Sequence, residues 1–195
     1  MSEITFKRKF YDEMLEWKMN SNGKSALMID GARRVGKSTI AEVFAKNEYD
    51  DYLLIDFVNA SKDIKDNFDN LGNMDVFFRN LFLFAGKGLK SSNSVIIFDE
   101  VQKFPRAREA IKYLVKDGRY HYIETGSLIS IKKKSQEIVI PSEEDKRKMY
   151  PMDFEEFLWA TGDNVTAPFI KDCFEKRIPM GDKLHRKIMT TFRTY

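Results

Sequence analysis

The chain has 195 residues, with 33 lysines and arginines against 30 aspartates and glutamates, and 43% of its residues are hydrophobic. This length and composition predict one folded domain with a small appendage, and they exclude a disordered tail. No apolar stretch reaches the roughly 18 residues that a membrane span needs, and residues 1–20 lack the apolar core of a secretory signal. A cytoplasmic protein without membrane contact is therefore expected.

The numbers of cysteines and histidines and the distribution of charge narrow the possible classes of protein further. One cysteine, Cys173, and two distant histidines, His121 and His185, offer neither an internal disulfide nor a structural zinc site. The net charge is +3, but residues 171–195 hold seven basic and three acidic residues, so the remainder is close to neutral. A protein partner or a second copy of the chain is expected, and nucleic acid is a candidate only through this basic tail and the lysines at 132–134.

Hydrophobic periodicity predicts alternating helices and strands through the first 127 residues. In chain order we expect a helix at 10–19, a strand at 25–30, a helix at 38–46, a strand at 52–57, a buried aromatic helix at 74–85, a strand at 94–99, a helix at 107–116 and a strand at 120–124. A polar stretch rich in Asp and Asn occupies residues 59–73. This alternation is typical of a parallel sheet with helices on both faces.

The pattern changes after Ser127. A charged, irregular and surface-exposed segment is expected up to residue 148, with a short strand or loop at 138–140. Asp153 is then the predicted N-cap of a helix through Trp159, with Glu156 as its reciprocal partner in a capping box. Two more helices are expected, the last from about residue 182 to the end.

Residues 31–38 (GARRVGKS) fit the Walker A pattern G-x-x-x-x-G-K-[ST] between a predicted strand and a predicted helix. The glycines allow backbone N–H groups to point at a phosphate, and the helix N-terminus adds partial positive charge. Lys37 is predicted to contact the β- and γ-phosphates of ATP, and Ser38 to supply a hydroxyl to Mg²⁺. The predicted ATP-binding residues are Gly31, Ala32, Arg33, Arg34, Val35, Gly36, Lys37, Ser38 and Thr39.

Two acidic residues follow the apolar strand at 94–99 in a Walker B pattern (VIIFDE). Asp99 is predicted to hold Mg²⁺, and Glu100 is the predicted catalytic residue that orients or deprotonates the attacking water. Glu100 favours ATP hydrolysis, because the D-x-x-G and N-K-x-D motifs of a GTPase are absent from the sequence.

The next strand ends in a polar residue that could sense the γ-phosphate. Thr125 is predicted for this role and Ser127 is the reserve, although an ordinary Thr-Gly turn explains the pattern equally well. Transition-state charge is often neutralised by an arginine from the same or a second subunit. The candidates are Arg33, Arg34, Arg106, Arg108, Arg119 and Arg147.

Four segments together, GARRVGKST, IIFDEVQKFP, YLVKDGRYHYIETGSL and YPMDFEEFLWA, resemble prokaryotic AAA-type ATPases that carry a C-terminal domain of unknown function. The resemblance covers residues 10–159. It implies an α/β P-loop NTPase fold of the additional-strand class, a three-layer sandwich with a mainly parallel sheet followed by a short helical C-terminal segment. Residues 52–57 are the candidate for the extra strand between the two Walker strands. Gln102 falls at a polar position similar to one in the family, without an assigned role.

The expected organisation is a lead-in at 1–24, a P-loop ATPase domain at 25–150, and a helical segment at 151–195 that starts a further domain and is cut short. The expected function is Mg²⁺-dependent hydrolysis of ATP to ADP and phosphate, driving a conformational change in a process that the sequence does not name. A module that binds ATP without turnover is the alternative. A small-molecule phosphotransferase is a third interpretation, against which Glu100 argues.

Overall fold

The computed structural model describes residues 6–90, 92–127 and 141–195. They form two compact units: residues 10–150 make up the larger one, and residues 151–195 with the segment up to Lys9 make up the smaller one. The expected segments at 132–134 and 138–140 lie outside the described residues. None of the helices within the described ranges is long and apolar enough to cross a membrane.

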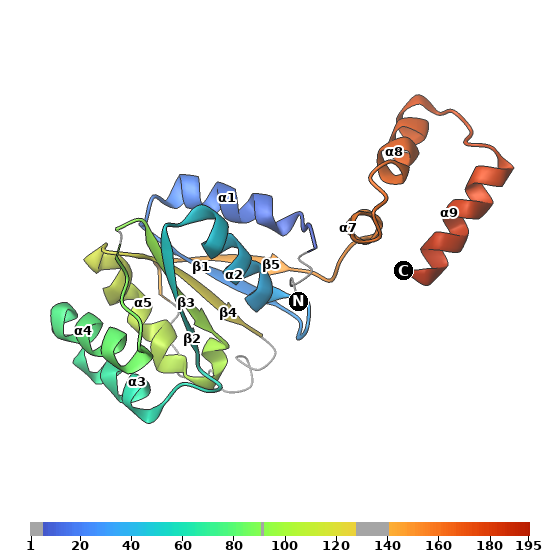
Figure 1. Cartoon of the computed structure of the whole chain (residues 1–195). Coiled ribbons are helices and arrows are strands. Elements are labelled where there is room, and N and C mark those ends of the chain that lie inside the picture. Colours follow the sequence, from blue (N-terminus) through green and yellow to red (C-terminus); the bar gives the residue numbers. More distant parts are fainter. Residues whose placement is uncertain (1–5, 91, 128–140) are drawn as a thin grey trace. The chain divides into compact units, whose positions relative to one another are not determined.

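The larger unit is built on a five-stranded sheet in the order β2-β3-β4-β1-β5, in which all neighbours are parallel (Figure 1). The strands are β1 (Ala26–Gly31), β2 (Asp51–Asp56), β3 (Ser94–Asp99), β4 (His121–Gly126) and β5 (Glu144–Met149). The α/β fold with a parallel sheet is thereby confirmed. Parallel order brings the carboxyl ends of β1, β3 and β4 to the same edge, where the predicted site residues follow them.

Helices cover both faces of this sheet (Figure 1). On one face lie α1 (Phe10–Ser21) and α2 (Lys37–Glu48), whose apolar residues form one core cluster with alternate residues of the strands. The other face carries α3 (Lys62–Asp66), the 3₁₀ helix η1 (Asn67–Asn70), α4 (Met74–Ala85) and α5 (Pro105–Asp117). Because β1 and β3 are covered on both sides, every one of their residues is buried.

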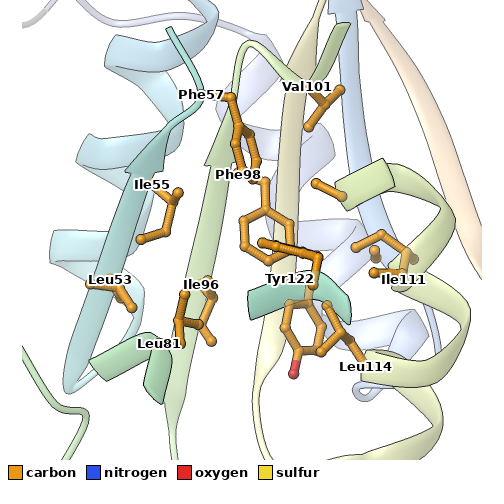
Figure 2. Close-up of a cluster of buried hydrophobic side chains, with 14 of the residues drawn as sticks. Leu53, Ile55, Phe57, Leu81, Ile96, Phe98, Val101, Ile111, Leu114 and Tyr122 are labelled. Atoms are coloured by element: carbon orange, nitrogen blue, oxygen red, sulfur yellow. The ribbon is translucent and has the colours of Figure 1, made fainter. Parts of the chain in front are cut away.

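The core cluster on the α4 and α5 face of the sheet contains many aromatic side chains around β3 (Figure 2). Phe98 points from β3 toward α4 and α5, and its ring contacts those of Phe57, Phe68 and Tyr122 at centroid distances of 5.6, 5.8 and 6.2 Å. Such ring pairs add to the free energy gained from burying apolar area. They hold β3 firmly, and with it the acidic residues at its end.

The polar stretch at 59–73 contains α3 and η1, which begin where Ser61 caps Ile64; such short helices have too few apolar residues to show a period. Three expectations about the fold were wrong. The helix expected at 74–85 is confirmed at these bounds as α4, but it is buried on one face only, and Leu83 is 74% exposed. The segment expected to be irregular up to residue 148 contains β5, which pairs with β1. Finally, the strand between β1 and β3 is β4, whereas residues 52–57 correspond to the edge strand β2.

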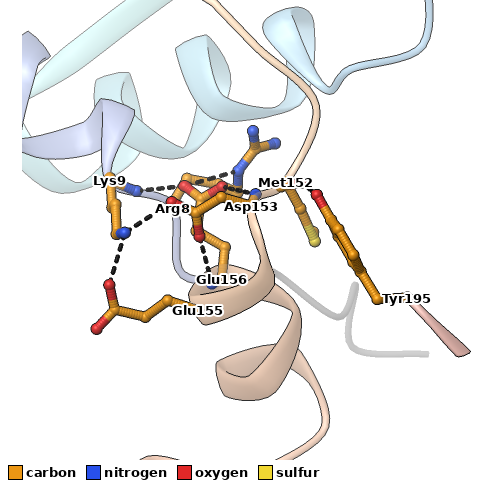
Figure 3. Close-up of polar contacts among 7 residues, drawn as sticks. All are labelled: Arg8, Lys9, Met152, Asp153, Glu155, Glu156 and Tyr195. Carbon is orange, nitrogen blue, oxygen red and sulfur yellow. Dashed lines mark hydrogen bonds and ion pairs between the residues drawn. The ribbon is translucent and has the colours of Figure 1, made fainter. Parts of the chain in front are cut away.

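In the smaller unit, the predicted capping box of Asp153 and Glu156 is confirmed at the start of α7 (Phe154–Ala160). The ammonium of Lys9 lies 2.6 Å from a carboxylate oxygen of both Asp153 and Glu155, and the Tyr195 hydroxyl donates to the Met152 carbonyl at 2.6 Å (Figure 3). These contacts tie both ends of the unit to residues 152–155, where α7 begins. The remaining helices are α8 (Thr166–Lys176) and α9 (Asp182–Thr194).

A buried ion pair joins the edge strand β5 to helix α5. The Arg108 guanidinium donates to both carboxylate oxygens of Glu144 at 2.7 Å, and both side chains are almost fully buried. Nearby, the carboxyl of Glu124 is fully buried and has no hydrogen-bond partner among the described residues. Burial, reinforced by the charge of Glu144, raises the pKa of Glu124 well above its ordinary value of 4.5, although Arg108 opposes this shift.

The raised pKa of Glu124 predicts a pH-dependent stability. The unfolded chain loses this proton near pH 4.5, but the folded chain retains it to a higher pH, so the free energy of unfolding falls as pH rises above 4.5. Glu124→Gln should flatten this decline in thermal melts between pH 5 and 8. Glu109→Gln, at an exposed position of α5, is the matched control and should keep the pH profile parallel to that of wild type. Parallel pH profiles for wild type and Glu124→Gln would contradict the assignment.

Candidate nucleotide-binding site

The loop of residues 31–38 connects the end of β1 to the start of α2, as the Walker pattern predicts. Gly36 occupies the N-cap position with φ of 95°, a left-handed conformation that favours glycine. No side chain caps the first turn of α2, so its backbone N–H groups are left open to an anion placed in the loop.

Gly31 is required for a different reason. A Cβ atom added at this position would lie 2.2 Å from the carbonyl oxygen of Met149 in β5, far inside van der Waals contact. The two residues are register partners in the sheet. The first glycine of the motif therefore permits strand packing, whereas the second permits the turn into the helix.

Lys37 is buried and folds back over the loop. Its ammonium donates to the carbonyl oxygens of Gly31 and Ala32 at 3.1 and 2.7 Å. Burial lowers the pKa of Lys37, and the carboxylates of Glu100, Asp30 and Asp99 oppose that shift. The Lys37 ammonium group is thus held between the loop and these acidic residues.

The Asp99 carboxylate joins three elements of the site. Its Oδ1 atom accepts a hydrogen bond from the Ser38 hydroxyl of α2 at 2.7 Å and another from the Thr125 hydroxyl of β4. Thr125 is fully buried and Asp99 nearly so. A carboxylate beside a hydroxyl is a set of hard oxygen donors, so Ser38 and Asp99 fit Mg²⁺, which prefers one or two carboxylates together with water and phosphate oxygens.

Glu100 adopts a left-handed backbone conformation with φ of 57°, which is rare for a residue with a side chain. Its N–H donates to the Thr125 hydroxyl oxygen at 3.2 Å, and its carboxylate accepts a hydrogen bond from the Gln102 side-chain amide. The Gln102 amide oxygen in turn accepts from the N–H of Ser127 at 3.4 Å. Sequence reasoning left Gln102 without a role, although its position two residues after Glu100 was the available signal.

The structure therefore brings Lys37, Ser38, Asp99, Glu100 and Thr125 together at one edge of the sheet. Ala32, Arg33, Arg34 and Thr39 are exposed, while Val35 and Gly36 are partly exposed. Four of the six candidate arginines are held in ion pairs, namely Arg106 with Asp69, Arg108 with Glu144, Arg119 with Asp75 and Arg147 with Glu16. Of the six, Arg33 and Arg34 are the two that lie on the loop itself.

A family model described as an AAA domain, AAA_14, matches residues 23–158. The chain belongs to this family. The resemblance to AAA-type ATPases is thereby confirmed, and the match covers all five strands of this AAA domain together with the start of the smaller unit. No curated protein matches the chain.

Solved structures resemble this AAA domain only distantly. A chain of Drosophila ORC bound to AT-rich DNA and Cdc6 is 12% identical with a TM-score of 0.48, and the alignment covers 95% of this chain and 81% of that chain. Pif1 helicase from Candida albicans is 11% identical with a TM-score of 0.45, covering 79% of this chain and 42% of that chain.

The close approach of β5 predicts that Gly31→Ala destabilises the AAA domain. The added methyl group would meet backbone that cannot move without disturbing the pairing of β1 with β5, so we expect a loss of about 3 kcal/mol. Urea denaturation measures the change. Gly72→Ala is the control, because nothing lies within 4 Å of its added Cβ, and its midpoint should stay close to wild type. An unchanged midpoint for Gly31→Ala would contradict the packing role.

Proposed function

We propose that this AAA domain binds ATP with Mg²⁺ at the loop of residues 31–38 and hydrolyses it to ADP and phosphate. The observation that carries the proposal is the convergence of Ser38 and Thr125 on the Asp99 carboxylate, beside the buried ammonium of Lys37. These side chains come from three separate elements of the sheet edge. Their spacing in the sequence and their meeting in space both agree with an ATPase site.

Charge supports a requirement for the cation. The charged side chains that act on the buried Lys37 are the carboxylates of Asp30, Asp99 and Glu100 and the guanidinium of Arg33. A nucleotide polyphosphate would be repelled by these acids. We propose that Ser38 and Asp99 hold Mg²⁺, which when bound neutralises charge on the phosphate oxygens.

Each remaining residue takes a role that its surroundings allow. The open N–H groups of the α2 first turn and the Lys37 ammonium would bind the β- and γ-phosphates. Glu100 would orient and deprotonate the attacking water, and Thr125 would sense the γ-phosphate through its hydrogen bonds to Asp99 and Glu100. We propose Arg33 and Arg34 as the arginines that would neutralise the negative charge of the transition state.

The energy of hydrolysis would drive a conformational change in a protein partner or in a second copy of the chain. A cytoplasmic location is proposed as the setting for this ATP-driven change. A phosphotransferase would instead consume ATP only when an acceptor molecule is added, forming ADP and a phosphorylated acceptor without releasing free phosphate.

Binding is tested without assuming turnover by thermal melts with and without Mg²⁺-ATP. Ligand at about 100 times its dissociation constant stabilises by about 2.7 kcal/mol. For a chain of this size that raises the melting temperature by about 5–10 °C. Lys37→Ala should abolish the shift. Lys24→Ala, which removes an exposed lysine before β1, should keep it. A wild-type protein that melts cooperatively but shows no shift would refute ATP binding.

Turnover is tested by phosphate release from the Glu100→Gln variant. The amide retains the shape of the side chain but cannot accept a proton, so the rate should fall by about 100-fold or more while the ATP-induced melting shift remains. Glu109→Gln, at an exposed position of α5, is the control and should hydrolyse at the wild-type rate. Normal hydrolysis by Glu100→Gln would contradict its role. Wild-type protein that binds ATP but never releases phosphate at any concentration would instead favour a nucleotide-gated binding module.

A further inference from the structure

Gln102 forms a bridge between the ends of two strands. It lies in the 3₁₀ helix η2 (Val101–Lys103), which follows β3, and only 7% of the residue is exposed. Its amide nitrogen donates to the Glu100 carboxylate, and its amide oxygen accepts from the N–H of Ser127, just after β4. The nitrogen and the oxygen of one buried amide therefore both form hydrogen bonds, one with the residue after β3 and one with the residue after β4.

The packing of Gly126 gives independent support for this bridge. A Cβ atom added at Gly126 would lie 3.0 Å from the amide oxygen of Gln102 and 2.9 Å from Cε of Met28. The φ of Gly126 is not in the left-handed region, so the backbone conformation does not require glycine. Instead, the missing side chain leaves the space that the Gln102 amide occupies.

Glu100 is consequently held from two sides. Its backbone N–H is tied to the Thr125 hydroxyl of β4, and its carboxylate is tied through Gln102 to Ser127. A non-glycine residue with φ of 57° persists only where its surroundings hold it in place. The two tethers supply that restraint.

We propose that Gln102 is a positioning residue that fixes the Glu100 carboxylate against the end of β4, and that Gly126 provides the space for it. This inference rests on the proposed function, in which Glu100 acts on the attacking water. A general base must lie within hydrogen-bond reach of the proton it removes, and a misplacement of about 1 Å can cost about 100-fold in rate. Because the hydrogen bonds of the Gln102 side chain go to Glu100 and to the N–H of Ser127, its loss should change turnover and leave nucleotide binding unchanged.

The kinetic test uses Gln102→Met, which keeps the length of the side chain but removes both hydrogen-bonding groups. We expect kcat for ATP hydrolysis to fall at least about tenfold, while the dissociation constant for Mg²⁺-ATP stays within about twofold of wild type. Gly126→Ala should lower kcat in the same way, because its methyl group displaces the amide. The matched control is Lys103→Met, an exposed neighbour in η2, which should change neither quantity. Equal kcat for wild type and Gln102→Met would overturn the proposal.

A second measurement does not depend on activity. In ¹⁵N-labelled protein, the side-chain amide resonances of Gln102 are identified by their loss in Gln102→Met. They should shift in Glu100→Ala and in Gly126→Ala, and remain in place in Lys103→Met. Resonances that do not move in Glu100→Ala would overturn the bridge even if no ATP is hydrolysed. Wild-type protein that shows the bridge but binds no ATP would refute the proposed function alone.

Discussion

The carboxylate of Asp99 is the constraint on which the arrangement of the site depends. In the sheet, β4 separates β3 from β1, so the end of β3 and the start of α2 lie about two strand spacings apart, roughly 10 Å. Side chains must bridge that gap. Asp99 does so by accepting hydrogen bonds from Ser38 of α2 and from Thr125, which stands on the intervening strand. Any change in strand order would break this bridge.

Small residues make such close bridging feasible at this edge. Gly31 lets β5 approach β1, and Gly126 leaves room for the Gln102 amide. Gly36 serves a different purpose, because its left-handed backbone turns the loop into α2. This edge of the sheet is therefore built from positions where a side chain is excluded, next to positions where a polar side chain is buried and hydrogen-bonded. The aromatic cluster below β3 then keeps the strand rigid.

Much of the fold was predictable, because its main strands are apolar runs bounded by turn residues. The strand at 94–99 was placed at its observed bounds, and the capping box of Asp153 was confirmed. The strand β5 was missed because it is charged, and its place in the sheet becomes evident only from its pairing with β1. The short helices between 61 and 70 were missed because a single turn has no detectable period. The assignment of residues 52–57 between the Walker strands failed because chain order does not give sheet order.

By itself, the sequence determined the features that depend on residues a few positions apart: the glycine loop before α2, the acidic pair after β3 and the cap of α7. Their chemistry is local, so spacing along the chain is enough to predict them. The tertiary structure alone decided which of these groups meet. The hydrogen bonds of Asp99 span 61 and 26 residues, that of Gln102 to Ser127 spans 25, and the ion pair of Arg108 spans 36. Such contacts follow from the order of strands in the sheet, which is set by how helices pack to bury both of its faces.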